Sequence, residues 1–150
     1  MRSNRYFIPP FLSIAICVSM IIAGCEETPS STTNDPIMQA TVDGTAWTGT
    51  NVDGTIFSGL KSVTGTAADG SSITLILKNI TTAGSLQIDG LNVAATYIKG
   101  GNTFTATSGT INVTELDASN NISGTFEFDG TSSGGLPIAV EGGSFTATLR

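Results

Sequence analysis

The side chains of this sequence that could do acid–base chemistry are its carboxylates. Hydrolysis by two carboxylates needs one that an apolar setting keeps protonated and one that stays ionised. The candidates are Glu115, Asp117, Glu127, Asp129 and Glu141. Histidine is absent from the 150 residues, so a serine or threonine nucleophile would lack its usual base. Because Glu127 falls on the polar face of a predicted strand, we expect solvated carboxylates and no enzymatic activity, with carboxylate-based hydrolysis as an alternative.

Oxygen ligands for a metal ion are offered by five Asp-Gly pairs. They are Asp43-Gly44, Asp53-Gly54, Asp69-Gly70, Asp89-Gly90 and Asp129-Gly130. No stretch has the spaced acids of a calcium-binding loop, whereas Asp and Gly are the residues that tight turns select. Zinc is disfavoured because the sequence has no histidine and only two cysteines, and these are its usual ligands. We therefore expect neither a metal nor another cofactor.

Two aromatic residues are candidates for ligand binding. Trp47 and Tyr97 each combine a flat apolar ring with a polar tip, so together they could form a stacking platform for a sugar or a peptide. The competing interpretation is core packing, which predicts that Trp47 is buried.

The cysteine with a recognisable setting is Cys25. Residues 1–10 carry two arginines and no acid, and residues 11–23 are apolar apart from two serines, as in a signal peptide. Those 13 residues would reach about 20 Å as a helix, short of the ~30 Å hydrocarbon core. Residues 22–25, "IAGC", resemble the lipobox of bacterial lipoproteins, in which the cysteine is acylated and becomes the new N-terminus. An ordinary signal peptide cut nearby, or a buried thiol, is the alternative.

These features divide the chain into three parts. Residues 1–24 are predicted to be a lipoprotein signal peptide that is removed, residues 25–36 an acylated cysteine with a flexible linker, and residues 37–150 a single β-domain. The linker contains two prolines and three acids, which favours a flexible tether. We expect the acyl chains on Cys25 to hold the protein on the outer membrane.

The charge of the mature chain limits its partners. Cleavage after residue 24 would remove two of the six basic residues and none of the twelve acids, which leaves a net charge of −8. Nucleic acids and anionic lipid headgroups are poor partners for such a surface. The expected membrane contact is therefore the lipid anchor itself.

After residue 36 the chain alternates apolar and polar residues, which predicts strands that are buried on one face. The segments "ISGTFEF" and "GSFTATL" place Phe126, Phe128 and Phe145 on apolar faces, so we expect these three side chains in the core. The expected strands lie near residues 37–42, 46–52, 56–66, 72–79, 85–90, 95–99, 103–107, 109–117, 122–129 and 138–149.

Turn signals between the strands predict an all-β antiparallel meander. All five Asp-Gly pairs are expected to be turns, and the similar segments "VDGTAW" at 42–47 and "VDGTIF" at 52–57 are expected to form two successive hairpins. Closure of eight to ten strands into a β-sandwich or a flattened β-barrel would remove exposed edges. The spacing alone does not distinguish the two forms.

Three segments together resemble a known family. "IMQATVDGTAWTGT", "SGTINVTELD" followed by "NISGTFEFDGT", and the final "VEGGSFTATLR" are similar to the pattern of a family of small bacterial lipoproteins labelled as a domain of unknown function. The resemblance covers residues 37–150 and implies an extracytoplasmic β-domain in Gram-negative bacteria, with no assigned activity or catalytic residues. Cys25-Glu26-Glu27 is similar to acidic signals that send such lipoproteins to the cell surface.

The sequence thus predicts a binding or structural module of the cell envelope, with a glycan, peptide or protein as its ligand. An inhibitor or shield is the alternative, because an acidic surface could attract a cationic lytic enzyme such as lysozyme.

Overall fold

The computed structural model describes residues 35–150. The predicted signal peptide, Cys25 and all but the last two residues of the predicted linker lie outside these residues. The described part contains strands and no helix, and hence none long and apolar enough to cross a membrane. Its ten strands are β1 (Ile37–Val42), β2 (Thr45–Gly49), β3 (Asn51–Phe57), β4 (Leu60–Thr66), β5 (Ser72–Lys78), β6 (Gly84–Gln87), β7 (Val93–Lys99), β8 (Asn102–Leu116), β9 (Asn121–Ser132) and β10 (Pro137–Thr148).

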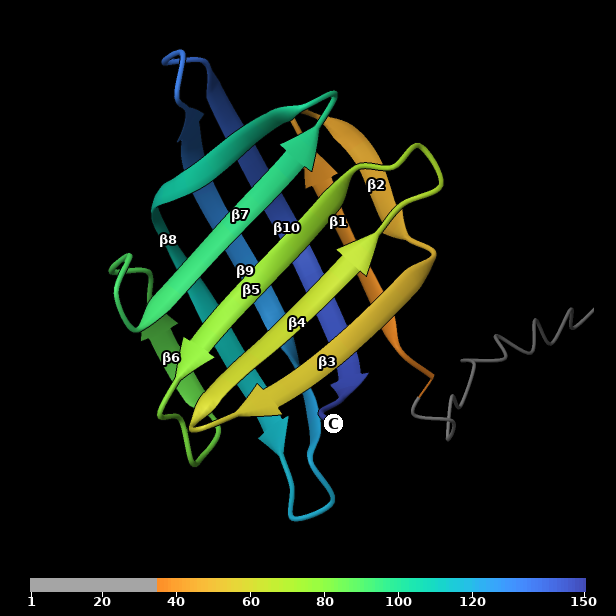
Figure 1. The fold of residues 1–150 in the computed structure, drawn as a ribbon, viewed down its shortest axis with the longest axis vertical. Helices are drawn as coiled ribbons and strands as arrows, with labels where there is room; N and C mark the ends of the chain where they lie inside the picture. The colour runs from red at the N-terminus through yellow and green to blue at the C-terminus, as the bar shows by residue number, and fades with distance from the viewer. Residues whose placement is uncertain (1–34) are drawn as a thin grey trace, which may run out of the picture. The chain divides into compact units, whose positions relative to one another are not determined.

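The strands form one antiparallel sheet that is nearly closed as a barrel (Figure 1). Their order is β2-β1-β10-β9-β8-β7-β5-β4-β3, with β6 paired to β8. The first and last members of this order, β2 and β3, are consecutive in the chain and are separated by Thr50, whose amide donates to the Thr66 carbonyl at 2.8 Å. The predicted all-β fold is confirmed, and it takes the barrel form.

The other end of β3 meets the end of β10. Gly54 and Leu149 form a parallel bridge. Beside it, the Ile56 amide donates to the Arg150 carbonyl at 2.9 Å, and the Arg150 amide donates to the Gly54 carbonyl at 3.1 Å. These bonds satisfy polar groups that the edge of an open sheet would expose.

Two of the five predicted Asp-Gly turns are wrong. Asp53-Gly54 lies inside β3 and Asp129-Gly130 lies inside β9, so the hairpin that follows residues 52–57 turns at Ser58-Gly59 and not at the Asp-Gly pair. Both glycines are needed for close approach. A Cβ on Gly54 would lie 2.7 Å from the Thr148 carbonyl oxygen, and one on Gly130 would lie 2.8 Å from that of Thr105.

The other Asp-Gly pairs do form turns. Asp43 and Gly44 have φ values of 46° and 75° and join β1 to β2, as expected of a hairpin with two positive φ angles. Gly70 and Gly90 also have positive φ, at 80° and 73°. In these three places the glycine is needed for its backbone conformation.

The division of the chain into strands differs from the prediction in three places, besides shifts of one to three residues at other strand ends. The expected strand at 46–52 is interrupted at Thr50, and the one at 56–66 is divided by a turn at Ser58-Gly59, where φ is 49° and 81°. Conversely, 103–107 and 109–117 form one strand, β8, whose pairing with β9 shifts between Ala106 and Ser108. A bulge explains this shift, because it changes which residues face inward without ending the strand.

The barrel interior is filled by side chains from its inward faces. Phe126, Phe128 and Phe145 are only 3%, 3% and 2% exposed, which confirms their predicted place in the core. Glycines make room for two of these rings: a Cβ on Gly143 would lie 2.5 Å from the Phe126 ring, and one on Gly124 would lie 3.0 Å from the Phe145 ring.

Candidate functional site

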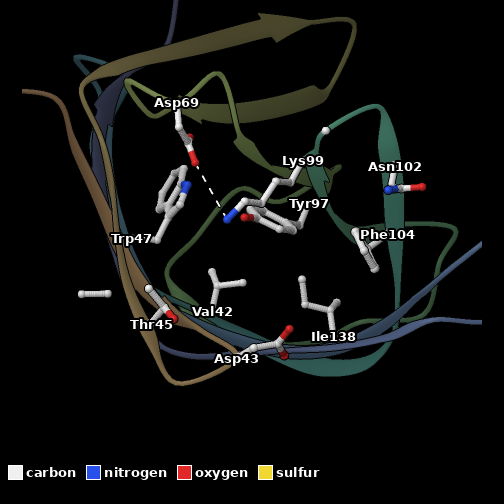
Figure 2. A pocket seen from close by; sticks show the side chains of 12 residues that line it. Val42, Asp43, Thr45, Trp47, Asp69, Tyr97, Lys99, Asn102, Phe104 and Ile138 are labelled. Atoms are coloured by element: carbon white, nitrogen blue, oxygen red, sulfur yellow. Dashed lines mark ion pairs between the residues drawn. The ribbon is translucent and has the colours of Figure 1, made fainter.

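A pocket of about 500 Å³ opens at the end of the barrel where β1 and β7 finish (Figure 2). This end is formed by the β1–β2 and β7–β8 hairpins, the β4–β5 turn and the start of β10. The volume lies within the ~300–1,000 Å³ usual for small-molecule sites. Apolar side chains form an inner wall, namely Val42, Trp47, Tyr97, Phe104 and Ile138. Polar side chains form the rim, namely Asp43, Thr45, Asp69, Lys99 and Asn102.

Strand alternation explains why an apolar wall is followed by a polar rim. On β7 the inward positions are Val93, Ala95 and Tyr97, all buried, and the next position of the same face is the exposed Lys99. Likewise, Thr45 lies two residues before Trp47 on β2, which puts both side chains on one face of the strand. On β2 and β7 the inward-facing position nearest the mouth therefore extends beyond the core, where a polar group can stay hydrated.

Trp47 is part of the core as well as of the pocket wall. Its side chain is 7% exposed, so the prediction of a buried Trp47 is confirmed. The indole Nε1 donates to Ser71 Oγ at 2.8 Å, and Ser71 Oγ donates to Asp69 Oδ1 at 2.5 Å. The polar tip of Trp47 is thus satisfied by the protein, and a ligand would contact the apolar part of the ring that borders the pocket.

Tyr97 presents its hydroxyl to the pocket. Its residue is 2% exposed, and its ring centroid lies 6.0 Å from that of Phe104. Tyr97 lines the pocket, and Figure 2 shows its hydroxyl beside the Lys99 side chain.

Opposite charges face each other at the mouth of the pocket. Lys99 Nζ lies 3.9 Å from Asp69 Oδ2, and the two side chains are 62% and 55% exposed, so the ion pair is weak and accessible. The hydroxyl and then the amide of Ser71 hold the pKa of Asp69 below its usual 3.8, and Lys99 adds a smaller effect. Asp69 is therefore a carboxylate at neutral pH.

Asp43 supplies the carboxylate on another side of the mouth. Its Oδ1 accepts a hydrogen bond from the Ala139 amide at 2.9 Å, and its own amide donates to the Ala139 carbonyl at 2.9 Å. These bonds fix the β1–β2 turn against β10. Only one carboxylate oxygen of Asp43 is used by them, so the other is available to a ligand.

The carboxylates of the alternative hydrolase hypothesis are not brought into an apolar setting. Glu127, Asp129 and Glu141 border a shallow depression of about 250 Å³ on the outer face of the barrel, and all three are exposed. Glu115 accepts a 3.4 Å hydrogen bond from the Ser123 hydroxyl. These carboxylates therefore lack the apolar surroundings that two-carboxylate hydrolysis requires.

Two further acids stabilise their own turns. Asp89 accepts backbone hydrogen bonds from Val93, Leu91 and Asn92, which hold its pKa below the usual range. The side chain and then the amide of Asn121 lower the pKa of Asp117 in the same way. In the described part of the chain, no group of three or more His, Cys, Asp or Glu residues is arranged to hold a metal ion.

The sequence nominated Trp47 and Tyr97, and the structure places both on this pocket. The sequence analysis did not identify the rim residues Asp43, Lys99 and Asn102 as site residues. For Lys99 a signal was present, because it continues the inward-facing row of Tyr97 by two residues. For Asp43 no local signal exists, since a turn aspartate next to glycine already has a structural role.

These features define a small antiparallel β-barrel with a ligand-sized pocket at one end. The chain belongs to the family described as a domain of unknown function, DUF6252, whose model matches residues 34–148, and the predicted membership of an uncharacterised family is thereby confirmed. Comparisons with curated proteins and with solved structures give no match.

Proposed function

We propose that this protein is an outer-membrane lipoprotein, anchored through Cys25, whose barrel binds a small ligand and performs no catalysis. The observation that carries the binding role is the pocket at the barrel end, where an aromatic wall lies beneath a polar rim. Such a combination gives a ligand both apolar contact area and groups that fix its orientation.

The chemistry of the pocket favours binding over catalysis. Acid–base hydrolysis needs a carboxylic acid that stays protonated at neutral pH, but the pKa of Asp69 is lowered. The other carboxylate, Asp43, is exposed and bonded to the Ala139 amide. Both are better suited to hold a positive or hydrogen-bonding group of a ligand than to transfer a proton.

The path of β1 supports exposure of the pocket to the aqueous phase. The described chain enters β1 at Ile37, and the pocket begins at Val42, the last residue of this strand. Six residues in a strand span roughly 20 Å at ~3.3 Å per residue. The mouth therefore lies at the opposite end of the strand from the segment that leads to the anchor.

Binding can be tested with the fluorescence of Trp47, which is the single tryptophan of the chain. The mature protein is titrated with amino acids, short peptides and neutral oligosaccharides, and at least one class should change the emission saturably. Thr45→Phe should abolish the change by filling the rim. Thr48→Phe, on the opposite face of β2, is the matched control and should leave it intact. A titration without any response, or equal binding by Thr45→Phe, would contradict the binding role.

Anchoring is tested separately with Cys25→Ala. Two or more acyl chains hold a protein on a membrane stably, at ~0.8 kcal/mol per buried CH₂. The variant should leave the salt-washed membrane pellet and take up no labelled palmitate, while its circular dichroism stays that of the parent. If the variant stayed in the pellet at parental levels, or the parent took up no palmitate, the lipoprotein assignment and the localisation would both fail.

A further inference from the structure

The pocket carries opposite charges on different sides of an apolar surface. Lys99 reaches over the pocket from β7, and Asp43 lies at the β1–β2 turn. In Figure 2 the side chains of Val42 and Ile138 lie between these two charged groups. A ligand that spans the pocket would thus meet an ammonium, an apolar surface and a carboxylate in turn.

We propose that the pocket binds a short zwitterionic peptide, with its C-terminal carboxylate at Lys99 and its N-terminal ammonium at Asp43. This inference rests on the proposed function, since it assigns a ligand class to the same pocket. The ligand side chain lies on Val42, Phe104 and Ile138.

The Lys99 ammonium is available for a ligand carboxylate. Its contact with Asp69 is 3.9 Å long and largely exposed, and Asp69 is already stabilised by two hydrogen bonds from Ser71. A bound carboxylate can therefore share Lys99 without leaving Asp69 unpaired. The Tyr97 hydroxyl, on the same face of β7, is placed to donate a second hydrogen bond to that carboxylate.

Ligands with one sign of charge fit less well. A simple anion would approach Lys99 but would also meet the carboxylates of Asp43 and Asp69, and a simple cation would meet the Lys99 ammonium. A zwitterion pairs with both signs. Selectivity of this kind arises from repulsion of the wrong ligand as much as from attraction of the right one.

The test compares one dipeptide with its two capped forms, using Trp47 emission of the mature full-length protein. The probes are alanyl-leucine, its C-terminal amide and its N-acetyl form, with a neutral disaccharide as the uncharged comparison. Loss of a hydrogen bond to a charged group should weaken binding of each capped form by roughly 10- to 100-fold.

Two variants assign each charge to its partner. Lys99→Gln should bind the dipeptide and its amide equally while it still discriminates against the N-acetyl form. Asp43→Asn should show the reverse pattern, because asparagine keeps the acceptor for the Ala139 amide and tolerates the φ of 46°. Lys99→Arg should restore the preference for a free carboxylate.

The outcomes separate this inference from the proposed function. Equal binding of the dipeptide and its capped forms would overturn the zwitterion assignment, as would discrimination that neither variant changes. Binding of the disaccharide alone, blocked by Thr45→Phe, would overturn the ligand class and leave the binding role standing. A lack of response to every probe would overturn both.

Discussion

Two aromatic groups lie inside this barrel, and they are packed in different ways. The phenylalanine cluster (Phe126, Phe128 and Phe145) comes from β9 and β10, while the pocket cluster (Trp47, Tyr97 and Phe104) comes from β2, β7 and β8. In the first, ring centroids lie 6.2 and 6.5 Å apart, and glycines adjoin the rings. In the pocket cluster, the inward-facing positions of the strands continue into polar residues at the end of the barrel, and a pocket lies between these residues and the rings.

The comparison shows how one strand pattern can give either a closely packed cluster of rings or the wall of a pocket. Both clusters arise from inward-facing positions of alternating strands. Trp47 also adjoins glycines, Gly49 and Gly65, but the inward rows of Tyr97 and Phe104 extend to Lys99 and Asn102 at the mouth of the pocket. The neighbours of an aromatic residue, more than its own type, therefore decide whether it can take part in binding.

The largest expected effect is on the phenylalanine cluster. Phe126→Ala removes a ring that is 3% exposed, which should lower the free energy of unfolding by about 3–5 kcal/mol of the ~5–15 kcal/mol typical for a domain. Phe57→Ala, at an 80% exposed position, is the control and should change it by less than ~0.5 kcal/mol. Thermal unfolding followed by circular dichroism measures both, and a Phe126→Ala variant that melts with the parent would contradict the described packing.

A smaller effect is expected when the same cluster is overfilled. The Cβ of Gly143→Ala would lie 2.5 Å from the Phe126 ring, and the forced shift should cost about 1–3 kcal/mol. Gly84→Ala is the matched control, because its Cβ would meet no atom within 4 Å. Urea denaturation should separate the two variants. Equal midpoints would show that the ring moves aside freely, which would remove the contrast between the clusters.

The pocket cluster depends on a hydrogen bond that the phenylalanine cluster lacks. Ser71→Ala removes the acceptor of the 2.8 Å bond from the Trp47 indole, at an expected cost of about 0.5–1.5 kcal/mol. Acrylamide should also quench Trp47 emission more efficiently in this variant. Ser85→Ala, at an exposed position on β6, should change neither quantity. Unchanged quenching in Ser71→Ala would mean that packing alone holds the indole.

The smallest expected effect concerns pH. Because the pKa of Asp69 is lower in the folded protein than its usual 3.8, its stabilising contribution is present above that value and is lost as the pH falls through the folded pKa. Asp69→Asn should therefore lose less stability than the parent between neutral pH and pH below 3.8. Unfolding at a series of pH values measures the difference, and parallel curves would show that Ser71 and Lys99 do not favour the ionised form.

The local alternation of apolar and polar residues was sufficient to predict most strands and the burial of the phenylalanine cluster. Phe126 and Phe128 are two residues apart, so they lie on the same face of their strand whichever strand is their neighbour. The local pattern was insufficient to predict which Asp-Gly pairs form turns. A glycine is required either where the backbone has a positive φ or where another segment approaches it closely, and the two cases look alike in the sequence. The approach at Gly54 involves Thr148, far along the chain, and no local feature announces it.

The candidate site was predictable only in part, for the same reason. Residue type predicted Trp47 and Tyr97 as site candidates, whereas the placement of Asp43 and Lys99 around the same pocket depends on how β1 and β7 are arranged in the barrel. The Cys25 prediction rests on adjacent residues alone, and it stays a prediction because it lies outside the described part.

The position of β1 between β2 and β10 also has a mechanical consequence. A force transmitted through the preceding chain acts on Ile37, along the axis of β1. If the barrel is held at its pocket end, the hydrogen bonds to both neighbours are sheared together and do not open one at a time. Tension on the chain that precedes Ile37 would therefore be resisted by two ladders at once, in a barrel whose pocket lies at the far end of the loaded strand.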